Sequence, residues 1–240
     1  MSDPFDGVLV VDKPAGPTSH DVVDAIRKQF GIKKVGHGGT LDPQATGVLV
    51  ILTGKGTKLS NRFMSSDKVY EGTIRLGSAT NTQDAQGETI SEGDYSNVTR
   101  EDMERVMEDF KGDIMQLPPM VSAVKIDGVP LYKRARKGEE VERKERLIHI
   151  YELVITEFGL PDSTFRVKCT KGTYVRTICA DIGEKLGCGA HLSQLRRTES
   201  GTVTLEQAIP FDEVMKKTRD ELMDDIIPIH KFAARVPGDK

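Results

Sequence analysis

Residues 36–49 read Gly36-His37-Gly38-Gly39-Thr40-Leu41-Asp42-Pro43-Gln44-Ala45-Thr46-Gly47-Val48-Leu49, a glycine-rich loop that runs into an apolar segment ending at Leu52. The segment Val48–Leu52 is typical of a buried strand. The loop places one carboxylate, Asp42, just before it. Since Asp-Pro pairs commonly initiate turns, the local pattern leaves two interpretations open: a turn residue or a catalytic carboxylate. The glycine spacing does not match a phosphate-binding loop, so nothing here favours a phosphate-binding metabolic enzyme.

Strands and helices can be predicted on both sides of this loop. Tyr70, Ile74 and Leu76 alternate with polar residues, which predicts a half-buried strand with Tyr70 on the apolar face. Further strands are expected at 7–11, 148–155 and 165–169, and helices at 18–30, 99–110, 178–186 and 211–223. This irregular alternation predicts an α+β fold with a mixed, largely antiparallel central sheet and flanking helices and loops.

The composition is that of a soluble globular protein, with 37% hydrophobic and 30% charged residues in 240. No apolar run approaches the length of a membrane helix, and the N-terminus has no targeting segment, so we expect a cytoplasmic protein. Three widely spaced cysteines and five scattered histidines predict neither a disulfide framework nor a metal site.

Basic residues gather in a few segments although the net charge is −3. The polar stretch 125–146 begins with five cations and reads as a long surface excursion, and further cations lie at 166–176 and 196–197. A solvated face is the ordinary explanation of a charge run. Several such clusters in one chain favour a phosphate-binding surface.

Six segments in register resemble the tRNA pseudouridine-55 synthases, the TruB family. Besides the Asp42 loop, the resemblance covers residues 12–19, 68–70 with 76–87, 116–125 with Tyr132 and 135–136, 171–176, and 189–198. Together these segments span about Gly7 to Gly201. The resemblance implies a sheet of the pseudouridine synthase type within one catalytic domain, residues 1–232, followed by a short tail, residues 233–240. Many relatives carry a C-terminal PUA domain, which we do not expect here.

The resemblance also implies three catalytic residues. Asp42 matches the catalytic aspartate, whose carboxylate can attack carbon and leave again. Arg176 matches the arginine that pairs with this aspartate and keeps it ionised; its alternative is a solvent-facing residue at a helix start. Tyr70 matches the tyrosine that stacks on the target base and assists removal of the C5 proton; its alternative is a core aromatic, and both can hold together.

Other residues are implied to bind RNA or shape the pocket. His37 matches the histidine that fills the space left by the flipped uridine, although from its pattern alone it is a solvent-exposed loop residue. Tyr174 and Leu195 resemble pocket-wall residues, and Lys13-Pro14 resembles a segment that supports the catalytic loop. The remaining expected RNA contacts are Lys125, Tyr132 and Arg136, in the 125–146 loop that closes over the RNA, and Lys171.

The implied function is isomerisation of a T-loop uridine of tRNA, position 55, to pseudouridine. The base flips out of its stack, and no cofactor or metal is needed. Attack on the base, attack on the sugar and elimination to a glycal-like intermediate all remain open. The expected partner is the T-arm stem-loop, bound by a monomer. The alternatives are a uridine in another structured RNA, guidance by a partner ribonucleoprotein, and a non-catalytic RNA-binding or tRNA-folding protein.

Overall fold

The computed structural model describes residues 4–122, 125–126, 128–131, 134, 139 and 141–233. The chain divides into two compact units. Unit 1 comprises Met1–Lys68 and Arg196–Lys240, and unit 2 comprises Val69–Leu195. Strands β4 (Lys68–Leu76) and β12 (Ala190–Ser200) each contribute residues to both units. The prediction of one catalytic domain over residues 1–232 stays a prediction.

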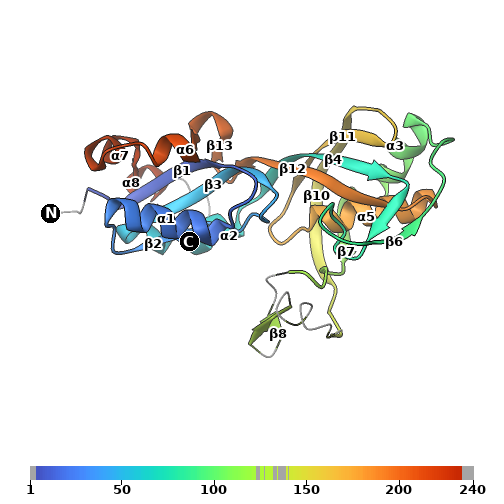
Figure 1. Ribbon diagram of the computed structural model, residues 1–240, viewed down its shortest axis with the longest axis horizontal. Helices are drawn as coiled ribbons and strands as arrows, with labels where there is room; N and C mark the ends of the chain where they lie inside the picture. The colour runs from blue at the N-terminus through green and yellow to red at the C-terminus, as the bar shows by residue number, and fades with distance from the viewer. Residues whose placement is uncertain are drawn as a thin grey trace, which may run out of the picture. The chain divides into compact units, whose positions relative to one another are not determined.

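Unit 1 is built on strands from both ends of the chain. Strand β1 (Gly7–Lys13) pairs antiparallel with β3 (Thr46–Thr53), which also pairs with β2 (Val35–His37) and, in parallel, with β12. On the far side of β1 lie β14 (Ile209–Pro210) and β15 (Ile227–Pro228), and β13 (Val203–Thr204) pairs with β12. Figure 1 shows these blue and red segments side by side. The expected strands at 7–11 and 48–52 are confirmed.

Helix α1 (Ser19–Phe30) forms as its end signals predict. Thr18 and Asp21 form a capping box, and Gly31 ends the helix in the left-handed conformation with φ 61°. Its buried face carries Val22, Val23 and Ile26. The other helical segments of unit 1 are η1 (Gly54–Leu59), α2 (Ser60–Ser65), η2 (Leu205–Gln207), α6 (Phe211–Val214), α7 (Arg219–Asp225) and α8 (His230–Ala233).

The expected single helix at 211–223 is wrong, because this segment forms two helices. The first, α6, ends at Val214, and Thr218 then caps α7 through a capping box with Glu221. The Thr-x-x-Glu pattern at 218–221 is a helix start signal inside the expected helix. The break therefore follows from a local signal that competes with the apolar periodicity.

Unit 2 contains a sheet with helices packed against it. The strands β11 (Asp162–Cys169), β10 (Arg146–Glu157) and β7 (Gly112–Gln116) form two successive antiparallel pairs beside β4. In its described residues, unit 2 also contains two short hairpins and two helices: β5 (Ser78–Thr80) with β6 (Thr89–Glu92), β8 (Lys125–Ile126) with β9 (Val129–Pro130), α3 (Arg100–Glu108) and α5 (Val175–Leu186). The mixed, largely antiparallel sheet with flanking helices confirms the expected fold class.

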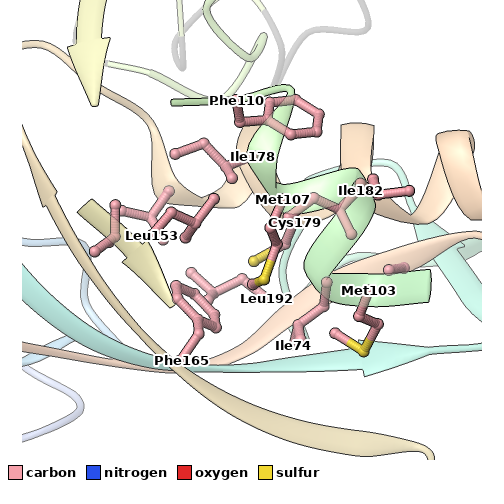
Figure 2. Packing of buried hydrophobic residues seen from close by; sticks show 14 of the residues in the cluster. Ile74, Met103, Met107, Phe110, Leu153, Phe165, Ile178, Cys179, Ile182 and Leu192 are labelled. Carbon is pink, nitrogen blue, oxygen red and sulfur yellow. The ribbon is translucent and has the colours of Figure 1, made fainter. Parts of the chain in front are cut away.

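Figure 2 shows the core of unit 2 between α3, α5 and the sheet. Met103 and Met107 of α3 and Ile178 of α5 belong to one buried cluster with Ile74 and Phe165 of the strands. Each is at most 2% exposed, and burial of such a side chain stabilises the fold by about 1.5–3 kcal/mol. This packing holds the N-terminal part of α5, whose first turn carries Arg176.

Candidate active site

The Asp42 side chain is exposed on the loop between β2 and β3 in unit 1. The Ala45 amide donates to the Asp42 carbonyl at 3.0 Å, which closes a turn around Pro43. Leu41, only 3% exposed, anchors the loop beside it, and its amide donates to Ser19 Oγ at 2.8 Å. Asp42 is thus an exposed turn residue on an anchored backbone.

Lys13 supports this loop from the end of β1. It is fully buried, and its Nζ donates to the carbonyls of Pro14, Pro43 and Ala45 at 2.8–2.9 Å. Burial lowers the pKa of Lys13 from 10.5 to about 8, although attraction to Asp42 opposes the shift. These contacts agree with the supporting role predicted for Lys13, because one ammonium group binds the backbone on both sides of Gln44.

Arg197 of β12 binds the same loop from another strand, a contact that the sequence did not reveal. It is 1% exposed, and it donates from Nε to the Val48 carbonyl at 2.8 Å, from Nη1 to Thr40 at 3.3 Å and from Nη2 to Gly39 at 3.1 Å. The sequence suggested only a cation in a basic cluster. One signal in the sequence could have revealed the contact: Arg197 occupies a core-facing position in the alternating pattern of β12.

His37 ends β2 at the start of the loop. It is half-buried, so the simple interpretation as a solvent-exposed residue is wrong. Its Nδ1 accepts a hydrogen bond from the Gly39 amide at 3.3 Å. Burial, followed by repulsion from Arg197, lowers the pKa of His37 below its usual 6.5, so the ring is neutral at neutral pH.

Arg176 lies in the first turn of α5 in unit 2 and is 4% exposed. Its Nη1 donates to the Thr82 carbonyl at 3.0 Å and its Nη2 to the Val121 carbonyl at 2.9 Å. Nη1 also lies 3.3 Å from Asp84 Oδ2. The alternative of a solvent-facing residue is therefore wrong. The Asp84 carboxylate is a second contact that the sequence did not reveal.

The Thr80–Gly87 loop holds Asp84 in place. Thr82 Oγ1 donates to Asp84 Oδ1 at 2.6 Å, and Thr80 Oγ1 donates to the Asp84 carbonyl at 2.7 Å. Gln83 adopts a left-handed backbone with φ 64°, and its side chain accepts from Thr177 Oγ1 of α5 at 2.8 Å. Such a conformation costs about 1–3 kcal/mol in a residue other than glycine and tends to occur at functional sites.

The aromatic and pocket-wall residues also belong to unit 2. Tyr70 is half-buried on β4 and packs with Leu195 against the core, so its core interpretation holds. Tyr174 precedes α5, and the Arg146 guanidinium lies 5.5 Å from its ring centroid. Lys171 is exposed. Unit 2 thus brings Tyr70, Leu195, Tyr174 and Arg176 into one compact body, while Asp42 and His37 belong to unit 1.

Some expected RNA contacts lie outside the described residues. These are Tyr132, Arg136 and the side chain of Lys125. Where the structure describes the chain, no group of three His, Cys, Asp or Glu side chains is placed to hold a metal ion. In the same part of the chain, no helix has the length and apolarity to span a membrane.

Comparison with known proteins identifies the family. The model of the TruB family pseudouridylate synthase N-terminal domain matches residues 27–175, and that of the tRNA pseudouridylate synthase B C-terminal domain matches residues 176–231. The chain belongs to the TruB family. It is therefore a pseudouridine synthase, an isomerase, and the predicted family resemblance is confirmed. The residue-level roles stay predictions.

Two relatives of this pseudouridine synthase, both described as tRNA pseudouridine synthase B, show how far the likeness extends. The protein from Opitutus terrae is 49% identical over 98% of this chain and 97% of its own length. The protein from Geotalea uraniireducens is 51% identical over 96% of this chain and 74% of its own length.

Solved structures give the same fold. A chain in the crystal structure of a Cbf5-Nop10-Gar1 complex superposes with a TM-score of 0.75 at 32% identity, over 95% of this chain and 61% of that one. A chain of the archaeal box H/ACA sRNP Nop10-Cbf5 complex gives a TM-score of 0.71 at 28% identity, over 95% and 61%. The pseudouridine synthase type of sheet is thereby confirmed.

Proposed function

We propose that this pseudouridine synthase converts the T-loop uridine of tRNA, position 55, to pseudouridine, with Asp42 as the nucleophile. Its membership of the TruB family and its relatives' description as tRNA pseudouridine synthase B support tRNA as the substrate. The observation that carries the assignment of Asp42 is its setting: an exposed carboxylate on a loop whose neighbouring carbonyls are bound by buried Lys13. Such a group is fixed in position yet open to a substrate.

The chemistry divides among three residues. The C1′–N1 bond of the uridine breaks, the uracil rotates, and C1′ joins C5, which then loses its proton. Asp42 forms a covalent bond to the uridine and later releases it, which divides one difficult reaction into easier steps. Tyr70 stacks on the base and assists removal of the C5 proton, and Arg176 supplies the cation that balances the carboxylate.

Access to the uridine requires base flipping, since a stacked base is closed to a nucleophile. Unstacking costs a few kcal/mol, and phosphate contacts from Lys171 and the 125–146 loop offset that cost and make binding fall with salt. His37 fills the space that the uridine leaves in the RNA. The enzyme acts as a monomer on the T-arm stem-loop and recognises mainly its shape.

Tritium release tests this proposal. A T-arm stem-loop carrying uridine tritiated at C5 is incubated with the native chain and with Asp42→Asn, and RNA binding is measured for both. We expect release by the native chain, none by the variant, and similar affinities. Equal release by both proteins would overturn the assignment of Asp42.

The alternatives give other outcomes of the same assay. Tight binding without release by either protein, on the stem-loop and on full-length tRNA, would favour a non-catalytic RNA-binding or tRNA-folding protein. Release from another structured RNA, and not from tRNA, would keep the chemistry and change the substrate. Release that requires an added ribonucleoprotein would point to a guided enzyme.

A further inference from the structure

We propose that Arg197 is a positioning residue for the isomerisation, whose guanidinium fixes the backbone on both flanks of the Asp42 loop. The inference rests on the proposed role of Asp42. It adds a function to a residue whose sequence pattern suggested only a surface cation. Arg197 acts through the loop, and no contact with the substrate is invoked.

The hydrogen bonds of Arg197 span the loop. Nη2 and Nη1 bind the carbonyls of Gly39 and Thr40, which precede Asp42, and Nε binds the carbonyl of Val48, which follows it in β3. Lys13 binds Pro43 and Ala45 between these points. Arg197 thus ties the entry of the loop to the strand at its exit. Because a guanidinium group is planar and rigid, these bonds also fix the separation of the two flanks.

The burial of Arg197 is costly for stability alone. In the described part of the chain its hydrogen-bond partners are backbone carbonyls, and the side chain is 1% exposed. Removing a charged side chain from water costs free energy, so fully buried charges are uncommon even where hydrogen bonds compensate them. Arg197 is a buried cation that is hydrogen-bonded to the loop of the proposed nucleophile. Local exceptions of this kind are found at functional sites.

The backbone is shaped to bring Arg197 to the loop. In the parallel pairing of β12 with β3, Arg197 lies opposite Gly47. Gly47 has φ +97°, and a Cβ at this position would lie 2.2 Å from the Arg197 carbonyl oxygen. Gly39 has φ +148°, and its added Cβ would lie 3.7 Å from Arg197 Nη1. Gly47 therefore allows the close approach of β12 to β3, whereas at Gly39 the positive φ, and not a lack of space, favours glycine.

The charges of Asp42 and Arg197 both act on Lys13. Attraction to Asp42 raises the pKa of Lys13, whereas repulsion from Arg197 lowers it. Lys13 is therefore within electrostatic reach of both Asp42 and Arg197. Removal of Arg197 frees one flank of the loop and also takes away positive charge near Asp42.

The experiment separates positioning from stability. Arg197→Met and Arg197→Lys are compared with Leu52→Ala, a control that damages the core of the same unit at the far end of β3, where Leu52 is fully buried. Melting temperature, affinity for the T-arm stem-loop and single-turnover tritium release at saturating enzyme are measured for each. The saturating rate reports on the bound, folded enzyme, so a purely structural role leaves it unchanged.

We expect Arg197→Met to lower the saturating rate by about 100-fold, the loss that follows a misplacement of about 1 Å, with the affinity within about threefold of native. Arg197→Lys keeps the positive charge but lacks the planar guanidinium group. Its saturating rate should therefore be intermediate between those of the native protein and Arg197→Met. Leu52→Ala should keep the native rate despite a lower melting temperature. If Arg197→Met does not fold, the Lys variant decides by the same criterion.

Two results would overturn the inference. One is a saturating rate for the Arg197 variants within about threefold of Leu52→Ala, and the other is a loss confined to affinity. Failure of the proposed function looks different: Asp42→Asn would then release tritium as fast as the native chain, or the native chain would release none.

Discussion

Raising the pH should slow this enzyme by removing the proton from Lys13. The Lys13 ammonium donates to three backbone carbonyls around Asp42, whereas a neutral amine has fewer protons to donate and no charge to attract carbonyls. The pKa of Lys13 is about 8, so at pH 9 about one molecule in eleven keeps the ammonium. The rate should therefore fall about tenfold at pH 9 and about 100-fold at pH 10.

The assay is single-turnover tritium release between pH 6 and 10, with Lys13→Arg as the matched control. Arginine stays protonated throughout this range, and the control shares any ionisation of the uracil N3–H. We expect the alkaline loss of rate in the native chain and not in the control. A native rate that is constant up to pH 9.5, or the same loss in Lys13→Arg, would refute the reasoning.

Stability should respond to the same titration in the opposite direction. The folded pKa of Lys13 is about 8 against 10.5 for the free side chain, so between these values the unfolded chain binds more protons than the folded one. The contribution of Lys13 to the free energy of unfolding therefore rises with pH across this window. A slower rate that comes from unfolding would instead be accompanied by a lower melting temperature.

Three further substitutions test the surroundings of the site. Gly47→Ala should lower the free energy of unfolding by about 1–3 kcal/mol more than Gly16→Ala in thermal melts, since both have positive φ but only Gly47 faces a close contact. Asp84→Asn should slow single-turnover release by about tenfold, because Arg176 loses the negative charge that Asp84 places beside it. His37→Gln should leave the rate profile between pH 7 and 8 unchanged, because burial lowers the pKa of His37 below 6.5 and keeps it neutral there.

Local signals in the sequence were enough to predict helices α1, α3 and α5 and strands such as β1, β3 and β4, whereas β12 and the short strands were not predicted. The capping box at Thr18 and the glycine at Gly31 gave the limits of α1 within a residue, since end signals act over a single turn. Alternation gave the buried face of β4, including the half-buried Tyr70. Helix limits were harder to predict where two local signals compete. At Thr218 a capping box begins a new helix inside an apolar periodicity that otherwise continues.

The sequence by itself thus determined the family motifs, including the Asp42 loop and the segment that carries Arg176. Only the tertiary structure decided what holds these groups. Arg197 meets Thr40 across 157 positions, and Arg176 meets Thr82 across 94. No periodicity within a segment encodes such contacts, because they depend on which strands pair and on where β3 and β12 approach each other at Gly47. Through such hydrogen bonds Arg197, which the sequence placed only in a basic cluster, becomes a buried support for the loop.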